Sequence, residues 1–217
     1  MVRLVGKRFL RKQLRVFRRR PQLIPIISSI SLLTIVAIGY ASNMHNQSPT
    51  VDPASYTQML NLIGRAESND NYNAYFGNAS NTEIKFTDMS IAEVMKWQAD
   101  FVAQGHASSA VGRYQIINTT LSGLVNHLAL DPNQKFDSIM QDRLAIALLE
   151  RRGSVDYVTG QLTPQQFAAN LAREWAALPR VIGGNDPNAS YYAGDGLNAS
   201  RTSVDEVMNA IEPISAQ

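Results

Sequence analysis

Cysteine is absent from this chain, so thiol catalysis, cysteine-ligated metal sites and disulfide bonds are excluded. Histidine is scarce, and His45, His106 and His127 are isolated, with no pair at metal-ligand spacing. The chain also has no glycine-rich phosphate loop and no serine nucleophile elbow. The sequence therefore predicts no metal and no other cofactor.

Acidic residues are absent from the first 51 positions, whereas nine of the 20 lysines and arginines lie within the first 20 positions. The other 11 basic residues are outnumbered by the 18 acidic ones, so the rest of the chain has a net charge of −7. This segregation requires a local explanation and does not indicate a basic surface over the whole protein.

Residues 23–41 contain no charged residue, and about 20 mostly apolar residues span the hydrocarbon core of a bilayer as a helix. The basic segment, residues 1–22, should stay in the cytoplasm and orient this helix, so we expect it to bind no nucleic acid. The prediction is a signal-anchor in the inner membrane, with everything after Ala41 on the periplasmic or wall side. The alternative is a cleaved signal peptide and a secreted protein, because Gly39 and Ala41 are small residues at plausible cleavage positions.

Residues 42–54 are polar, contain two prolines and predict a linker, followed by one domain over residues 55–217. Helical periodicity and capping residues predict helices from 52 to about 67, 90–105, 119–130, 137–152, 163–178 and a short one after 203. Residues 68–85 hold five asparagines and no helical period, which indicates a loop with a short β-hairpin. The predicted fold is α+β and mainly helical.

Glu67 is the strongest catalytic candidate on physical grounds. It ends the first predicted helix, beside the apolar residues Leu62, Ile63 and Ala66. The negative end of the helix dipole and partial burial would both raise its pKa. A carboxylic acid that stays protonated near neutral pH can protonate a glycosidic oxygen. The structural alternative is a solvated surface glutamate.

A second candidate segment is Gly-Arg-Tyr-Gln at residues 112–115. Gly112 permits close backbone approach, and Arg113, Tyr114 and Gln115 supply hydrogen-bond donors and a stacking face suited to a sugar polymer. The alternative is a turn followed by a buried, strand-like segment. For Trp175, in a later segment, we favour a core residue, and the alternative is a platform for a sugar ring.

Five short motifs occur in order along the chain. They are Ala-Glu-Ser at 66–68, Phe-Thr-Asp at 86–88, Gly-Arg-Tyr-Gln at 112–115, Gln-Asp at 141–142 and Trp-Ala-Ala-Leu-Pro at 175–179. With this order and spacing, residues 56–211 resemble the phage lambda endolysin family of muramidases. The resemblance implies a lysozyme-like fold of two lobes, one helical and one containing a small β region, with a groove between them. It also implies peptidoglycan as the partner, in a monomeric enzyme.

The resemblance makes Glu67 the catalytic residue. Substrate-binding roles follow for a set of groove residues, which are Tyr72, Asp88, Arg113, Tyr114, Gln115 and Tyr192, with Tyr191 as the alternative to the last. The chain departs from the family in its predicted membrane segment and in a longer segment at 180–190.

The activity that the resemblance implies is a lytic transglycosylase, which cuts between N-acetylmuramic acid and N-acetylglucosamine and leaves a 1,6-anhydro end. Glu67 alone would act as acid and then as base. A hydrolytic muramidase would need a second carboxylate, for which Asp88 is the candidate. Two other possibilities stay open: an inactive, membrane-anchored module that binds peptidoglycan, and a wall-cleaving part of an envelope-spanning machine.

Overall fold

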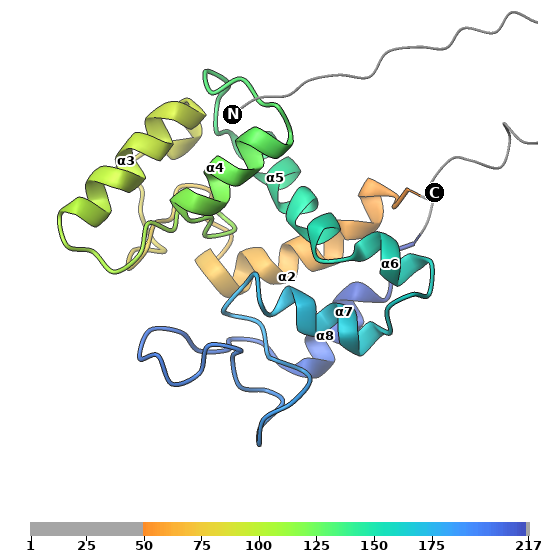
Figure 1. Ribbon diagram of the computed structural model, residues 1–217. Helices are drawn as coiled ribbons and strands as arrows, with labels where there is room; N and C mark the ends of the chain where they lie inside the picture. The colour runs from red at the N-terminus through yellow and green to blue at the C-terminus, as the bar shows by residue number, and fades with distance from the viewer. Residues whose placement is uncertain (1–49, 216–217) are drawn as a thin grey trace, which may run out of the picture. The chain divides into compact units, whose positions relative to one another are not determined.

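The computed structural model describes residues 50–215, which are mainly helical (Figure 1). The predicted basic segment, the predicted membrane segment and most of the predicted linker lie outside the described residues. None of the helices within residues 50–215 is long and apolar enough to cross a membrane. Val51 is buried, and the Asp52 amide donates to the Ser215 carbonyl at 3.0 Å, so the folded part begins within the predicted linker.

The regular structure of the described residues consists of seven α-helices and two short 3-10 helices. In chain order they are η1 (Pro53–Tyr56), α2 (Thr57–Ser68), η2 (Phe86–Asp88), α3 (Ile91–Ala103), α4 (Asn118–His127), α5 (Ser138–Arg151), α6 (Ser154–Val158), α7 (Pro164–Leu171) and α8 (Val204–Ile211).

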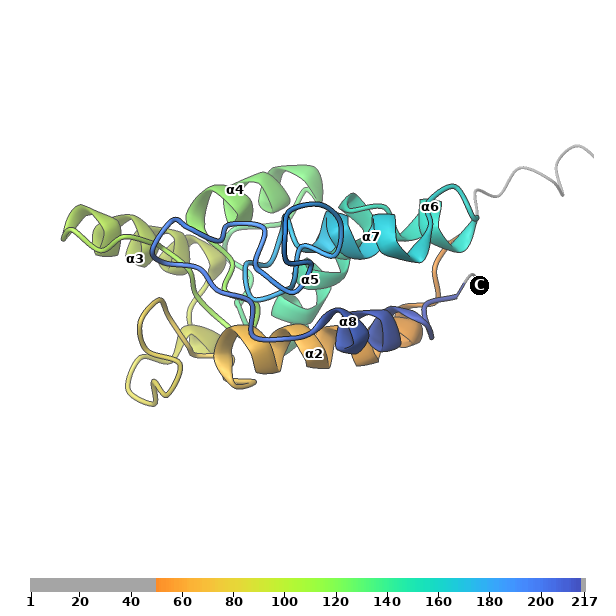
Figure 2. The ribbon, with the colours of Figure 1, turned by 90° about the horizontal axis from the view of Figure 1, so that it is seen from below.

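Helix α2 lies at the centre of the described residues, packed against α5 and α8 (Figure 1). It buries Met59, Leu62 and Ile63 on one face, as its apolar spacing predicts. The view in Figure 2, turned by 90°, again places α3 toward one end and α6 toward the other, with α2 and α8 side by side. In both views the C-terminal end of α2, which carries Glu67, points toward the α3 end of the arrangement and away from α6.

The predicted β-hairpin at residues 68–85 is wrong, because no sheet forms anywhere in the described residues. Only isolated bridges occur, such as Tyr75 with Asn78 and with Val111. Asparagine side chains supply the hydrogen bonds that a sheet partner would have made. Asn71 donates to the carbonyls of residues 79 and 81, and Asn81 donates to those of residues 73 and 84. Side-chain amides that satisfy backbone groups locally compete with a sheet ladder.

The capping predictions are confirmed for α3, α7 and α8. Ser90, Thr163 and Ser203 each accept a hydrogen bond from the backbone three residues on, in a full capping box. Helix α5 is capped by Asp137 and ends before Gly153, whose φ of 101° is left-handed.

Two features of the helical prediction are wrong. Helix α6 was not predicted. The helix predicted over residues 163–178 ends at Leu171, and the chain continues in turns to Trp175 and Leu178, both buried. After Leu171 the amides of Arg173 and Glu174 donate to carbonyls three residues back, as in a 3-10 turn. In a continued helix the Ala177 amide would bond to the Arg173 carbonyl, but here it donates to Glu67, and the Arg173 carbonyl accepts from Tyr192.

Candidate functional site

A cleft of about 650 Å³ opens at the C-terminal end of α2. Four stretches of chain line it: the end of α2, the Asn-rich loop, the segment before α4, and the turns and long loop between α7 and α8. The lining residues include Glu67, Tyr75, Phe76, Ser108, Gln115, Ile117, Glu174, Trp175, Tyr192, Asn198 and Arg201. Aromatic faces and polar groups therefore converge on one carboxyl at the end of a rigid helix, a combination suited to a polysaccharide.

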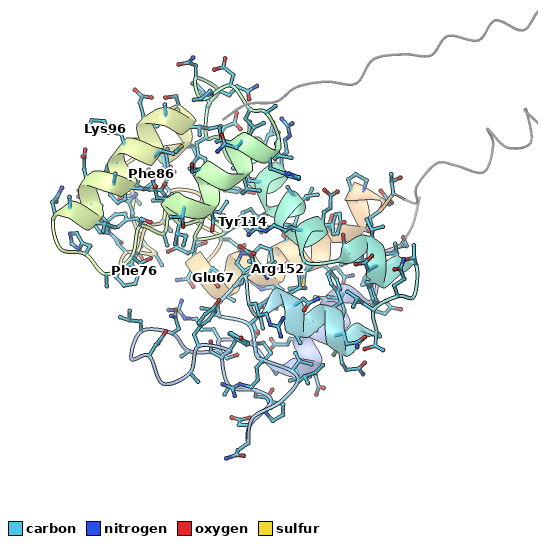
Figure 3. The ribbon with its side chains drawn as sticks, in the orientation of Figure 1. Glu67, Phe76, Phe86, Lys96, Tyr114 and Arg152 are labelled. Atoms are coloured by element: carbon cyan, nitrogen blue, oxygen red, sulfur yellow. The ribbon has the colours of Figure 1, made fainter. Side chains whose placement is uncertain are left out.

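Glu67 lies at the C-terminal end of α2 and projects into this cleft (Figure 3). Its Oε1 atom accepts a hydrogen bond from the Ala177 amide at 3.0 Å. Burial raises the pKa of Glu67, against the opposite effects of the Ala177 amide and the Arg201 charge. The net direction is upward, so the side chain keeps its proton to a higher pH than an ordinary glutamate.

Arg201 is the cation beside Glu67. It lines the cleft and donates from Nη1 to the Ala66 carbonyl at 3.1 Å, which satisfies one of the last carbonyls of α2. Sequence reasoning missed this residue, because it lies 135 positions from Ala66 and belongs to no motif. Its contribution stabilises the carboxylate form of Glu67 after that residue has given up a proton.

The next residue, Ser68, ties the end of α2 to the Gly-Arg-Tyr-Gln segment. Its buried hydroxyl donates to the Arg113 carbonyl at 2.8 Å. The Arg113 guanidinium in turn bonds Asn61 at 2.8 Å and Asp70 at 2.7 Å. This connection fixes the end of the helix relative to the segment that contributes Gln115 to the cleft.

Tyr72, Arg113 and Tyr114 lie together, and their polar groups bond one another and Asp142. Arg113 is 8% exposed and Tyr114 is 1% exposed, and their side chains face the interior. The hydroxyls of Tyr72 and Tyr114 both donate to Asp142 Oδ1, at 2.8 and 2.6 Å, while Arg113 donates to Tyr114 at 2.8 Å. Neither Tyr72 nor Arg113 lines the cleft, and the donors that were expected to meet sugar are used within the protein.

Gln115 and Tyr192, by contrast, line the cleft as expected. Gln115 has a φ of 47°, an uncommon conformation for a residue with a side chain, and donates to the Gly112 carbonyl at 2.9 Å. Tyr192 is 38% exposed and donates to the Arg173 carbonyl at 2.8 Å. Both side chains therefore have fixed orientations and faces open to a ligand.

Asp88, the candidate second carboxylate, is exposed and does not line the cleft. A different carboxylate does: Glu174, which sequence reasoning missed. The Glu174 side chain is 7% exposed and pairs with both Arg151 and Arg152 at 2.8 Å. Its position directly before the Trp-Ala-Ala-Leu-Pro motif could have marked Glu174 as a site residue. The sequence, however, does not show that Arg151 and Arg152 lie beside it.

A smaller cavity of about 220 Å³ adjoins the cleft and shares Gln115, Glu174 and Tyr192 with it. Arg151, Arg152 and Arg173 line only this smaller cavity. Across residues 50–215, no three His, Asp or Glu side chains come together in a way that could hold a metal ion.

Comparisons with known proteins identify the family of the chain. No curated protein and no solved structure matches the chain. A protein-family model described as Endolysin matches residues 57–192, a span that includes Glu67, Gln115, Glu174 and Tyr192. This span is more than half of the chain, so the protein belongs to the endolysin family of lysozyme-type, peptidoglycan-cleaving enzymes.

Proposed function

We propose that the protein is a lytic transglycosylase, which cleaves peptidoglycan between N-acetylmuramic acid and N-acetylglucosamine with Glu67 as its single acid and base. The observation that carries the proposal is the state of the two carboxylates in the cleft. Glu67 has one hydrogen-bond donor and a raised pKa, whereas both oxygens of Glu174 accept from guanidinium groups. Only Glu67 is available for proton transfer.

In the first half of the reaction, protonated Glu67 donates its proton to the glycosidic oxygen as the bond to the muramic anomeric carbon breaks. The leaving sugar departs as an alcohol, and positive charge develops at the anomeric carbon. Burial supports this step because it favours the protonated form of Glu67.

In the second half, the Glu67 carboxylate takes the proton from the 6-hydroxyl of the same muramic residue. The 6-oxygen closes on the anomeric carbon and forms the 1,6-anhydro ring, so Glu67 ends protonated as it began. The Ala177 amide and the Arg201 charge favour the carboxylate between the two transfers. Gln115 and Tyr192 contact the sugar, and Arg113 with Tyr114 positions the cleft wall.

The test is mass spectrometry of the soluble products that the purified full chain releases from peptidoglycan. Muropeptides that end in 1,6-anhydro-N-acetylmuramic acid support the proposal. Reducing ends would mean hydrolysis with a second carboxylate, and an absence of products would favour an inactive binding module.

Membrane attachment through residues 23–41 is a separate proposal, which rests on their lack of charge and on the basic segment before them. The enzyme would then act on wall within reach of the membrane. Fractionation of cells that produce the full chain tests this: the protein should stay in the membrane fraction in high salt and leave it in detergent. Release by high salt alone would contradict an integral segment.

A further inference from the structure

The smaller cavity beside the cleft has a charge that a neutral sugar backbone does not require. Its lining contains three arginines, Arg151, Arg152 and Arg173, and one carboxylate, Glu174. With one negative charge against three positive ones, the cavity has a net charge of +2. A concave surface with an excess of one sign of charge attracts ligands of the opposite sign.

The three arginines are not equivalent. Arg151 and Arg152 pair with Glu174, which orients them and neutralises one charge. Arg173 is exposed, and no ion pair forms with it among the described residues. Its guanidinium lies over the Tyr191 ring, 5.6 Å from the ring centre, a contact that does not use its N–H donors.

The smaller cavity and the cleft that holds Glu67 share part of their lining. Gln115, Glu174 and Tyr192 line both spaces, and the Arg152 and Arg173 charges both act on the Tyr192 hydroxyl. Figure 3 labels Arg152 and Glu67, one from each space. A substituent on the sugar bound at Glu67 could therefore reach the arginines without leaving the protein surface.

We infer that the smaller cavity binds a carboxylate of the peptide stem that muramic acid bears, so that the enzyme prefers peptide-bearing glycan strands. The inference rests on the proposed function, because it requires a muramic residue at Glu67. Arginine suits this ligand, since its planar fork of donors matches a carboxylate in two parallel hydrogen bonds. The peptide stem is the part of peptidoglycan that supplies carboxylates next to the cut bond.

The experiment compares kcat/KM of the full chain on two substrates: glycan strands that bear peptides, and the same strands after an amidase has removed the peptides. The ratio of the two values measures preference for the stem. In R173Q the ratio should fall roughly three- to tenfold, the loss expected for a partly exposed charged hydrogen bond. R173K keeps the charge but loses the planar fork, so its ratio should lie between those of R173Q and the unsubstituted protein.

R143Q is the matched control. Arg143 is exposed on α5, the helix that also carries Arg151, but it lines neither cavity, so its loss changes net charge alone. The ratio for R143Q should equal that of the unsubstituted protein. An equal fall in R143Q and R173Q would overturn the inference, because general charge would then explain it.

Two further substrates identify the anion. Strands whose stem carboxylates have been converted to amides should behave like peptide-free strands, and peptide-bearing strands freed of phosphate polymers should keep the full ratio. A ratio that depends on phosphate instead of carboxylate would overturn the stem assignment. If the unsubstituted chain cleaves peptide-free strands but R173Q leaves the ratio unchanged, this inference alone fails. If it cleaves neither strand, the proposed function fails with it.

Discussion

Two regions of the cleft each present a glutamate, and their surroundings are opposite in character. At the end of α2, Glu67 is half-buried beside one backbone amide, and burial raises its pKa. At the turn after α7, the Glu174 side chain is only 7% exposed, but two guanidinium groups neutralise it.

The difference shows that burial alone does not decide what a carboxylate does. A buried carboxyl with few hydrogen-bond donors and few cations around it has a raised pKa and keeps its proton. A carboxyl that contacts two cations is stabilised as a carboxylate and stays in a fixed ion pair. In the proposed function, the cleft therefore has one acid for chemistry, Glu67, and one ion-pair cluster, which lines the adjoining cavity. Four predictions test this division, from the largest expected effect to the smallest.

The largest effect should come from E67Q, which keeps the shape of the side chain but removes the proton donor. We expect kcat/KM on peptidoglycan to fall about a thousandfold or more, as for the loss of a general acid. E174Q should retain far more activity than E67Q. The measurement is the rate of release of anhydro-muropeptides, with circular dichroism as the check of folding.

E83Q is the matched control, because Glu83 is exposed on the Asn-rich loop and does not line the cleft. It should keep the activity of the unsubstituted protein. Comparable losses in E67Q and E174Q would break the division between the two glutamates.

The second effect concerns stability at the Glu174 end. The double variant R151Q/R152Q leaves a nearly buried carboxylate without a cation, and we expect a loss of about 2–3 kcal/mol in the free energy of unfolding. E174Q should cost less, because the arginine side chains are 45% and 29% exposed and water can solvate them. Urea denaturation measures both; a double variant as stable as the parent would show that the cluster is not an anchor.

The third effect is the dependence of stability on pH at the Glu67 end. The pKa of Glu67 is higher in the folded than in the unfolded state, so folding stability falls as pH rises through the interval between the two. Within this interval the parent loses about 1.4 kcal/mol of unfolding free energy for each unit of pH, and E67Q, which has no titrating group, does not. Above the interval E67Q should therefore be more stable than the parent, and below it the two should converge. A difference independent of pH would argue against a raised pKa.

The smallest effect is that of Arg201 on the pH profile. Its charge lowers the pKa of Glu67, so R201Q should move the alkaline limb of the kcat/KM profile to higher pH, by less than about one unit because the side chain is exposed. R143Q, at a residue that does not line the cleft, should leave the limb in place. If the alkaline limb does not move in R201Q, the charge of Arg201 does not influence the pKa of Glu67.

Local signals in the sequence predicted much of the helical frame. Ser90 with Glu93, Thr163 with Gln166 and Asp137 each identify a helix start, because a cap acts within three residues. Glu67 was also found locally, as a carboxyl at the end of an apolar-faced helix before a polar loop.

What failed in the prediction depended on partners distant in the chain. The Asn-rich loop looked like a hairpin because the sequence does not show that Asn71 and Asn81 bond the backbone around them. The assignment of Tyr72, Arg113 and Tyr114 to sugar binding could not take account of Asp142. This carboxylate accepts from both tyrosines and lies 3.8 Å from Arg113, a neighbourhood that is recognised only after folding.

The sequence by itself determined the helical frame, the family motifs and the position of the acid, because caps, helical periodicity and short motifs act over a few residues. Only the tertiary structure decided what the polar side chains do. It brought Ala177 and Arg201 to Glu67, and it set Arg151 and Arg152 around Glu174. Charge pairing and burial depend on distances in space between residues up to 135 positions apart, and no local pattern encodes them.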